Sequence, residues 1–204
     1  MTIKKLLIAN RGEIAIRIAR AAADLGITTT GIYSEDDEQS LHCRSVDQAI
    51  PLSGHGAPAY LDIDAIVEIA TNNNCDAIHP GYGFLSENAE FAKRATAAGL
   101  TFVGPTPELL ALFGDKGQAR AAAVSAGIPV IKGTDSNTTL AEATTFFESM
   151  GPNGAIMIKA IAGGGGRGTR VVTKKEDIAE AFARCASEAK NAFGRGDLYV
   201  EELI

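Results

Sequence analysis

A run of glycines is the stretch of the sequence best suited to binding an anion. Residues 163–166 are all glycine, and Lys159 and Arg170 carry positive charge on either side of the run. Glycine has no Cβ and tolerates positive φ, so successive backbone N–H groups can turn toward one anion. The run lies between two short stretches of β type, residues 155–159 and 170–173. These features predict a loop that covers a polyphosphate, with a flexible linker as the alternative.

Two familiar nucleotide-binding patterns fit the glycine run poorly. Gly163, Gly165 and Gly168 match the spacing GxGxxG. A dinucleotide-binding turn, however, leads from a strand into a helix, and here a strand-like stretch follows. The run is also not closed by the Gly-Lys-Ser/Thr of a P-loop. The sequence therefore predicts phosphate binding without either of these motifs.

A second stretch, HPGYGFLS at residues 79–86, has the composition of a ligand-binding loop. It follows a predicted strand, and in an open parallel sheet the loops at the carboxyl ends of strands line the ligand crevice. Tyr82 stands between Gly81 and Gly83, which leaves its ring exposed to a flat substrate. We interpret His79 as a hydrogen-bonded loop histidine, with a catalytic base as the alternative.

Two further groups of charged residues, one after a predicted strand and one at the start of a predicted helix, each allow two interpretations. The acidic residues 35–38 follow a strand where a Rossmann protein places its ribose-binding acid. Residues 10–15, however, contain one glycine where the dinucleotide fingerprint needs three, so we interpret the acidic run as a solvated loop. Lys116 opens a predicted helix and opposes its dipole, which indicates a nearby anion; a solvated lysine is the alternative.

The elements that would position these residues begin with a β/α series. Strand-like and helix-like stretches alternate from residue 6 to residue 126, which predicts a parallel α/β sheet. The predicted helix N-caps are Asp62, Ser86, Thr106 and Asp115. The first helix is expected to bury Ile14, Ile18, Ala21, Ala22 and Leu25. Its charged face has Glu13/Arg17 and Arg20/Asp24 at i,i+4 spacing, which we interpret as solvated, with a dimer contact as the alternative.

A turn-rich passage, residues 128–139, marks the boundary to a second unit. Thr139 and Thr173 each stand three residues before a glutamate, the spacing of a capping box, and so predict two helices with the glycine hairpin between them. Spacings of three and four place Cys185 on the apolar stripe of the second helix. Residues 197–204 predict a final strand. Because natural domains rarely stop inside an apolar strand, we expect the sequence to belong to a longer protein.

The composition excludes several classes of function. The chain has 204 residues, 46% hydrophobic and 22% charged, which is typical of a globular protein. A net charge of −6 disfavours nucleic acid and anionic membrane surfaces as partners. The first residues lack the long apolar core of a signal peptide, so we expect a cytoplasmic protein. Cys43, Cys75 and Cys185 are widely spaced and odd in number, which predicts free thiols.

Taken together, these stretches resemble the biotin carboxylase family of ATP-grasp enzymes. The residues that carry the resemblance are 8–15, 79–88, 114–116, 158–160, 163–168 and 200–201. The resemblance spans the whole chain. It implies a Rossmann-like amino-terminal domain (1–114), a helical linker (115–133) and the small α+β lid subdomain of an ATP-grasp fold (134–204). It also implies that the larger carboxy-terminal domain lies outside this sequence.

The resemblance assigns binding roles to individual positions. Lys116 and Lys159 would contact ATP phosphates, and Gly164, Gly165 and Gly166 would cover them. The adenine would be lined, largely through backbone, by Glu201, Glu202, Leu203 and Ile204. Tyr82 and Gly83 would lie near the ureido ring of biotin. No catalytic residue and no metal ligand is assigned within the chain.

For an intact member of the family, the resemblance implies a two-step ligase reaction. ATP phosphorylates bicarbonate to carboxyphosphate, and the released CO₂ is captured by biotin. The expected cofactors and partners are ATP, Mg²⁺ held by residues outside this chain, a biotin carboxyl carrier, a carboxyltransferase and a second copy of the chain. The acceptor (acetyl-CoA, propionyl-CoA, pyruvate or urea) stays open. We expect the chain alone to be inactive; a stand-alone nucleotide-binding or interaction module and another ATP-grasp ligase are the alternatives.

Overall fold

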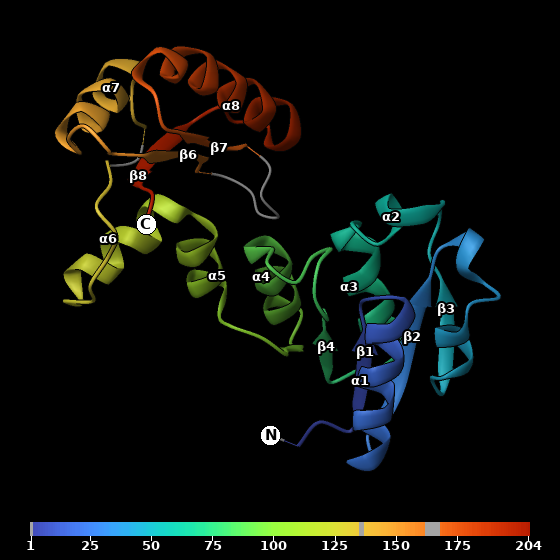
Figure 1. Ribbon diagram of the computed structural model, residues 1–204. Coiled ribbons are helices and arrows are strands. Elements are labelled where there is room, and N and C mark those ends of the chain that lie inside the picture. Colours follow the sequence, from blue (N-terminus) through green and yellow to red (C-terminus); the bar gives the residue numbers. More distant parts are fainter. Residues whose placement is uncertain (1, 135–136, 162–167) are drawn as a thin grey trace. The chain divides into compact units, whose positions relative to one another are not determined.

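The chain folds into two compact units (Figure 1). Its computed structural model describes residues 2–134, 137–161 and 168–204. Unit 1 comprises Met1–Ala111 and unit 2 comprises Leu112–Ile204.

Unit 1 is built on a sheet of five parallel strands in the order β3-β2-β1-β4-β5. The strands are β1 (Lys5–Ile8), β2 (Thr28–Tyr33), β3 (Gln48–Pro51), β4 (Ala77–His79) and β5 (Thr101–Phe102). The helices are α1 (Gly12–Asp24), α2 (Gly56–Ala59), α3 (Ile63–Asn72) and α4 (Ala89–Ala97), and two 3₁₀ turns follow β2: η1 (Glu35–Asp37) and η2 (Leu41–Arg44). This architecture confirms the predicted Rossmann-like α/β class.

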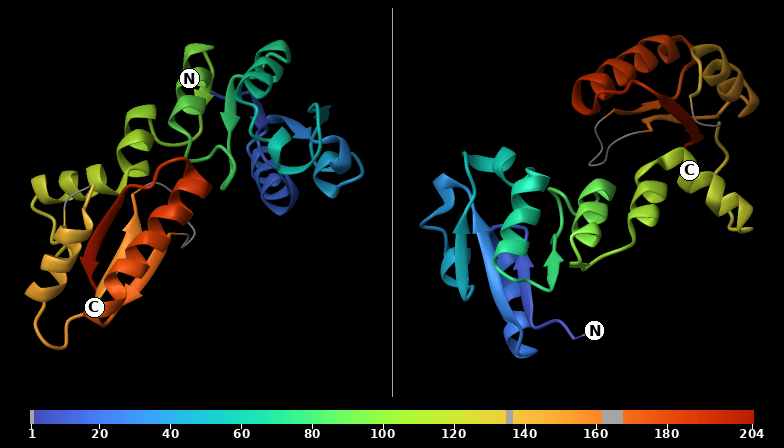
Figure 2. Two further views of the ribbon diagram at one scale, coloured as in Figure 1. Left: turned by 90° about the horizontal axis from the view of Figure 1, so that it is seen from above. Right: turned by 180° about the vertical axis from the view of Figure 1, so that it is seen from behind.

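Helices cover both faces of this sheet, as the alternation of side chains along β1 requires (Figure 2). Leu6 and Ile8 pack in a core with the α1 residues Ala15, Ile18, Ala19 and Ala22. Leu7 points to the other face and packs in a core with residues of α3 and α4, including Ile66 and Phe91. The predictions that Ala21 and Leu25 belong to the core are wrong. Ala21 lies on the exposed side of the helix, and Leu25, which follows the end of the helix at Asp24, is 75% exposed.

Unit 2 is a three-stranded antiparallel sheet in the order β7-β6-β8. Its elements are α6 (Lys116–Ser125), α7 (Leu140–Ser149), β6 (Ile156–Ala160), β7 (Thr169–Val172), η3 (Lys175–Asp177), α8 (Ile178–Phe193) and β8 (Leu198–Glu202), and α5 (Pro107–Gly114) spans the boundary between the units. Helices α7 and α8 lie on one face of the sheet (Figures 1 and 2). Cys185 is fully buried in the core between them, as its position on the apolar stripe predicted. This unit confirms the predicted small α+β subdomain.

Several predicted caps are present. Asp62 accepts a hydrogen bond from the N–H of Ala65, and Asp115 accepts one from the N–H of Gln118. Thr139 forms a full capping box with Glu142 at the start of α7. In each case the side chain satisfies a backbone donor that the first helical turn leaves without an intrahelical partner.

Two predicted caps are wrong. Ser86 does not cap α4; turns bring the chain to Asn88, whose Oδ1 accepts from the N–H of Phe91 at 2.9 Å. Thr173 does not cap α8, because η3 intervenes and α8 begins only at Ile178, after Asp177. In both cases a tight turn makes the helix begin later than predicted. The spacing of apolar residues in the sequence does not reveal such a turn.

The three cysteines are free thiols, as predicted. Among the described residues, no helix is both long enough and apolar enough to cross a membrane.

Candidate functional site

The two faces of the unit 2 sheet differ in chemistry. Ile156, Ile158, Leu198 and Val200 are buried against α7 and α8. Met157 pairs with Glu201 across the antiparallel ladder, and Lys159 pairs with Tyr199. Because directly paired residues share a face of a sheet, these four side chains lie on the face opposite the helices. We call Met157, Lys159, Tyr199 and Glu201 the polar face.

Lys159 and Glu201 form an ion pair across β6 and β8 on the polar face. The Lys159 side chain is 26% exposed and that of Glu201 is 12% exposed. The Tyr199 hydroxyl donates to the second carboxylate oxygen of Glu201 at 3.2 Å. Burial, and then the negative charge of Glu201, raise the pKa of Tyr199 to about 12, so the phenol stays protonated and donates at neutral pH. An anionic ligand that contacts Lys159 would therefore share its ammonium with Glu201.

Lys116 reaches the end of β6 from the first turn of α6. Its Nζ lies 3.4 Å from the carbonyl oxygen of Ile161, to which it donates a hydrogen bond. Ile161 is the last described residue before the glycine run and stands two residues after Lys159 in the sequence. Gly164, Gly165 and Gly166 lie outside the described residues.

The predicted adenine segment continues from β8. The N–H of Glu202 donates to the carbonyl oxygen of Lys132 at 2.8 Å, and that of Leu203 donates to Ala155 at 2.9 Å. Ile204 is 95% exposed. A backbone contact from this segment to a base would therefore use groups other than these two N–H donors.

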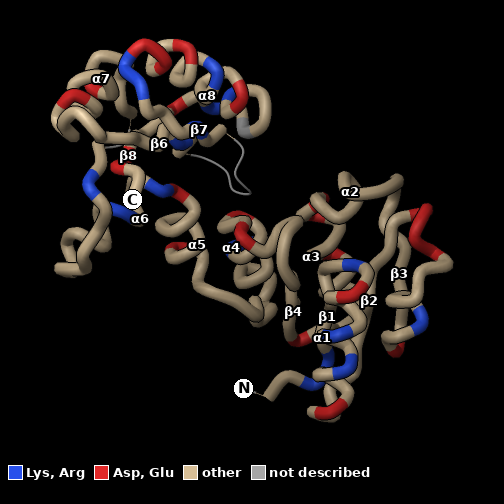
Figure 3. Tube along the Cα trace, viewed as in Figure 1, with Lys and Arg blue, Asp and Glu red and all other residues tan. Residues whose placement is uncertain are grey.

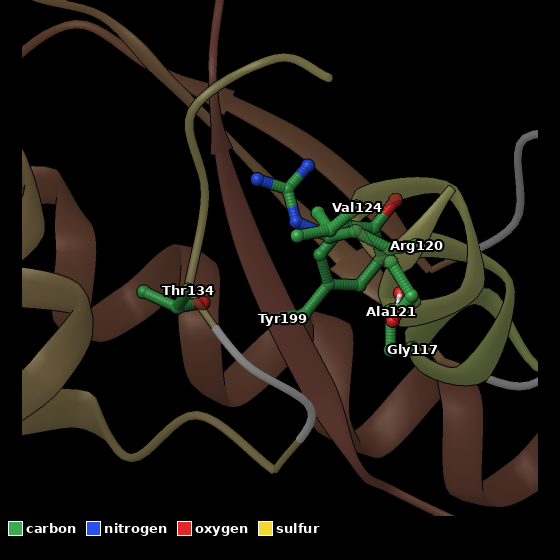
Figure 4. Close-up of a pocket in the computed structure, with 7 residues that line it drawn as sticks. Gly117, Arg120, Ala121, Val124, Thr134 and Tyr199 are labelled. Atoms are coloured by element: carbon green, nitrogen blue, oxygen red, sulfur yellow. Dashed lines mark hydrogen bonds between the residues drawn. The ribbon is translucent and has the colours of Figure 1, made fainter. Parts of the chain in front are cut away.

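A pocket of about 380 Å³ opens between α6 and β8. Arg120, Val124 and Tyr199 line it, with Thr134 on the segment beside β8 (Figure 4). Tyr199 connects this pocket to the polar face, because its hydroxyl bonds Glu201. Neither Arg120 nor Tyr199 was predicted from the sequence. The signal for Tyr199 is its position two residues before Glu201 in a predicted strand, because residues two apart share a face of a strand.

The second predicted site lies at the carboxyl edge of the unit 1 sheet. The Tyr82 side chain is 61% exposed, and its hydroxyl lies 3.4 Å from a carboxylate oxygen of Glu13. His79 Nδ1 accepts a hydrogen bond from the N–H of Gly81 at 3.0 Å, which confirms that this histidine is hydrogen-bonded, although it is the last residue of β4 and not part of the loop. Burial lowers the pKa of His79, in accord with this acceptor role for a neutral imidazole.

Four consecutive acidic residues, 35–38, follow β2 (Figure 3). They are not all solvated. Asp37 is 3% exposed and accepts hydrogen bonds from Arg11 at 2.5 Å and from the Tyr60 hydroxyl at 2.8 Å. Burial opposes its ionisation, but hydrogen bonds from Arg11, Tyr60 and Ser40 outweigh burial and lower the pKa of Asp37. The solvated-loop prediction is therefore wrong for Asp37. Because its carboxylate is engaged within unit 1, it also does not serve as a ribose-binding acid.

No metal cluster is present in the described ranges: no three His, Cys, Asp or Glu side chains there lie close enough together to hold a metal ion.

Comparison with known protein families decides the assignment. The family model for the biotin carboxylase N-terminal domain matches residues 2–110. The chain belongs to the biotin carboxylase family. Residues 115–204 match the family model for the ATP binding domain of the carbamoyl-phosphate synthase L chain. The resemblance seen in the sequence is thereby confirmed.

Relatives of this biotin carboxylase segment include pyruvate carboxylases. The chain is 51% identical over 207 residues to pyruvate carboxylase from Bacillus subtilis (strain 168), with 100% of this chain and 18% of that protein covered. It is 50% identical over 205 residues to mitochondrial pyruvate carboxylase from Homo sapiens, with 99% of this chain and 17% of that protein covered. The chain thus spans about a sixth of the length of these relatives.

Solved biotin carboxylase structures have the same fold. The complex of biotin carboxylase with β-γ-ATP from Campylobacter jejuni superposes with a TM-score of 0.95 at 40% identity, covering 100% of this chain and 46% of that one. The biotin carboxylase domain dimer of Hydrogenobacter thermophilus 2-oxoglutarate carboxylase, solved with MgADP, ADP and bicarbonate, gives a TM-score of 0.92 at 39% identity, covering 100% of this chain and 45% of that one.

Proposed function

We propose that the chain is the amino-terminal part of an enzyme that carboxylates biotin with bicarbonate at the expense of ATP, through carboxyphosphate. The observation that carries the proposal is the hydrogen bond from Lys116 Nζ to the carbonyl oxygen of Ile161, which stands two residues after Lys159. Both lysines lie within the segment that matches an ATP-binding family. Phosphoryl transfer depends on fixed cations that stabilise charge on the transferred group, and two lysines so placed suit that reaction.

The proposal gives roles to the residues singled out in the sequence. Lys116 and Lys159 contact ATP phosphates, and Gly164, Gly165 and Gly166 cover them. The segment formed by Glu201, Glu202, Leu203 and Ile204 lines the adenine. Tyr82 and Gly83 face biotin. The corresponding domains are 1–114, a helical linker at 115–133 and a lid subdomain at 134–204.

Among the described residues, no three His, Cys, Asp or Glu side chains lie close enough together to hold a metal ion. Mg²⁺ at a phosphoryl-transfer site is held by one or two carboxylates together with the phosphates, and the family resemblance implies that these carboxylates belong to a domain outside these 204 residues. The chain alone is therefore expected not to turn over.

The proposed partners are a biotin carboxyl carrier, a carboxyltransferase and a second copy of the chain, in a cytoplasmic enzyme. The biotin carboxylase domain from Hydrogenobacter thermophilus was solved as a dimer, which supports the last of these partners. The acceptor is carboxylated on another domain, and solved relatives act on different acceptors. Pyruvate is the first to assay, because the Bacillus subtilis and human relatives are pyruvate carboxylases.

Exchange of segments between relatives tests this proposal. The chain should replace the matching segment of Bacillus subtilis pyruvate carboxylase and leave a chimera that fixes bicarbonate in an ATP-dependent reaction. Lys159→Gln in the chimera should strongly reduce this activity, whereas Lys174→Gln, at an exposed position of the same unit, should leave it intact. A folded chimera that binds nucleotide but fixes no bicarbonate would favour the binding-module alternative.

A further inference from the structure

We propose that Asn10 is a positioning residue for the loop of residues 80–84, and that it holds this loop in the conformation that presents Tyr82 to its ligand. The proposal rests on the proposed function in one respect, namely that the ligand at Tyr82 is the flat ureido ring of biotin. The loop itself and its contacts with Asn10 are features of unit 1.

The side chain of Asn10 connects the ends of two neighbouring strands. Asn10 lies just beyond β1 and is 2% exposed. Its Nδ2 donates to the carbonyl oxygen of Pro80 at 2.7 Å and to that of Tyr82 at 2.9 Å. Its Oδ1 accepts from the N–H of Arg11 at 2.9 Å. Both amide protons are thus used to hold a loop that is 70 residues away in sequence.

The loop adopts a backbone conformation that it would not favour by itself. Gly81 has φ of +68°, Gly83 of +67° and Phe84 of +42°. Positive φ is unfavourable for a residue with a side chain such as Phe84, and such conformations persist only where the surroundings impose them. The loop is therefore held by its contacts.

Three contacts impose this conformation. The loop backbone rests directly on Asn10, because a Cβ at Gly81 would lie 2.6 Å from Asn10 Nδ2. His79 Nδ1 fixes the N–H of Gly81. The Phe84 ring stacks on Tyr60 with 5.1 Å between centroids. Of these groups, Asn10 alone holds the carbonyls on both sides of Gly81, so it determines how the loop presents the residue between the two glycines.

These contacts fix the backbone of residues 80–84 while the ring of Tyr82 stays exposed. The Tyr82 side chain is 61% exposed although its carbonyl oxygen is bonded to a buried amide. A binding surface that is ordered before the ligand arrives avoids the entropy cost of ordering on binding. Loss of the two amide donors should leave the loop free to sample other conformations, and so weaken binding at Tyr82 while every residue of the proposed nucleotide site stays unchanged.

The variant Asn10→Asp tests the positioning directly. It keeps the shape of the side chain and the acceptor for Arg11, but it replaces the two donors with an oxygen that repels the carbonyls of Pro80 and Tyr82. The matched control is Thr29→Val, which removes the hydrogen bond of a buried side chain to Asp47 in the same sheet without touching the loop.

Amide NMR relaxation and hydrogen exchange of the chain report on loop order. In Asn10→Asp, the amides of Gly81 and Gly83 should gain mobility and exchange faster while the amides of the sheet stay unchanged, and Thr29→Val should leave both loop amides as in the parent. A loop equally ordered in Asn10→Asp and in the parent would overturn the proposal whatever ligand the loop binds.

Kinetics of the full-length protein test the consequence for binding. Asn10→Asp should raise the KM for free biotin about tenfold, a loss of about 1.4 kcal/mol, and leave the KM for ATP unchanged. If Tyr82→Ala raises the KM for biotin and Asn10→Asp does not, the positioning role is wrong and the biotin site stands. If neither variant changes the KM for biotin, the placement of biotin at Tyr82 fails and the proposal fails with it.

Discussion

At the scale of single residues, the ion pair between Lys159 and Glu201 combines two roles in one contact. Glu201 neutralises a partly buried ammonium, and the Tyr199 hydroxyl fixes the orientation of the carboxylate. A lysine on a flexible four-carbon stem otherwise has many rotamers. The Lys159 ammonium is therefore already restrained before a ligand binds, and a phosphate that contacts it would share it with Glu201.

Substitution of Lys159 tests its contact with nucleotide. Lys159→Gln in the full-length protein should weaken ADP binding by ~1 to 3 kcal/mol, because a direct charge-assisted hydrogen bond to phosphate is lost. Isothermal titration calorimetry measures this, with Lys174→Gln as the control. An unchanged dissociation constant would remove Lys159 from the site and favour the linker interpretation of the glycine run.

Two histidines in unit 1, the buried His42 and the half-buried His79, give a prediction about pH. His42 is 1% exposed, and its Nε2 lies 3.2 Å from the carbonyl oxygen of Ile32. Burial lowers the pKa of His42 despite this carbonyl, and burial also lowers the pKa of His79. The unfolded chain therefore binds more protons than the folded chain once the pH falls below the usual histidine pKa of about 6.5.

The free energy of unfolding should thus be fully retained above about pH 6.5 and should fall as the pH is lowered from there, by at most about 1.4 kcal/mol per pH unit for each histidine. Urea unfolding followed by circular dichroism between pH 8 and pH 5 measures it. His42→Gln keeps a donor for Ile32 and should make the dependence shallower. The same slope in the parent and the variant would contradict the role given to His42.

At the scale of elements, sequence patterns predicted most helices and strands, because apolar spacing reports directly on which face of an element is buried. They failed where a short turn moves a boundary, as before α4, where Asn88 caps in place of Ser86. For the site, Lys159 and Tyr82 could be identified from local patterns. Asn10 could not, because its partners are 70 and 72 residues away, and only the folded sheet brings them together.

The two predicted capping boxes, at Thr139 and Thr173, lead to different expectations for the stability of their alanine variants. Thr139→Ala should destabilise unit 2 by ~1 kcal/mol, because its side chain accepts from the N–H of Glu142 at the start of α7. Thr173→Ala should change stability by less than ~0.5 kcal/mol, because no cap forms there. Urea unfolding of the two variants compares them directly. Equal losses would mean that Thr173 does cap a helix in solution.

At the scale of the whole molecule, the two units match two families in tandem, and each brings one proposed binding surface. Unit 1 presents Tyr82 on a loop held by Asn10, and unit 2 presents Lys159 on the polar face. Phosphoryl transfer from ATP also needs Mg²⁺ to neutralise charge on the phosphates. We propose that the ligands of this ion lie outside these 204 residues, so residues 1–204 should bind nucleotide without turnover.

The most direct test of biotin carboxylation is an assay of ADP release with bicarbonate present, with and without free biotin. The full-length protein should release ADP in a biotin-stimulated reaction that Lys159→Gln largely abolishes, and residues 1–204 alone should release none above background. Biotin-stimulated ADP release by residues 1–204 would contradict the account. So would a folded full-length protein that binds ATP but does not release ADP faster when biotin is added.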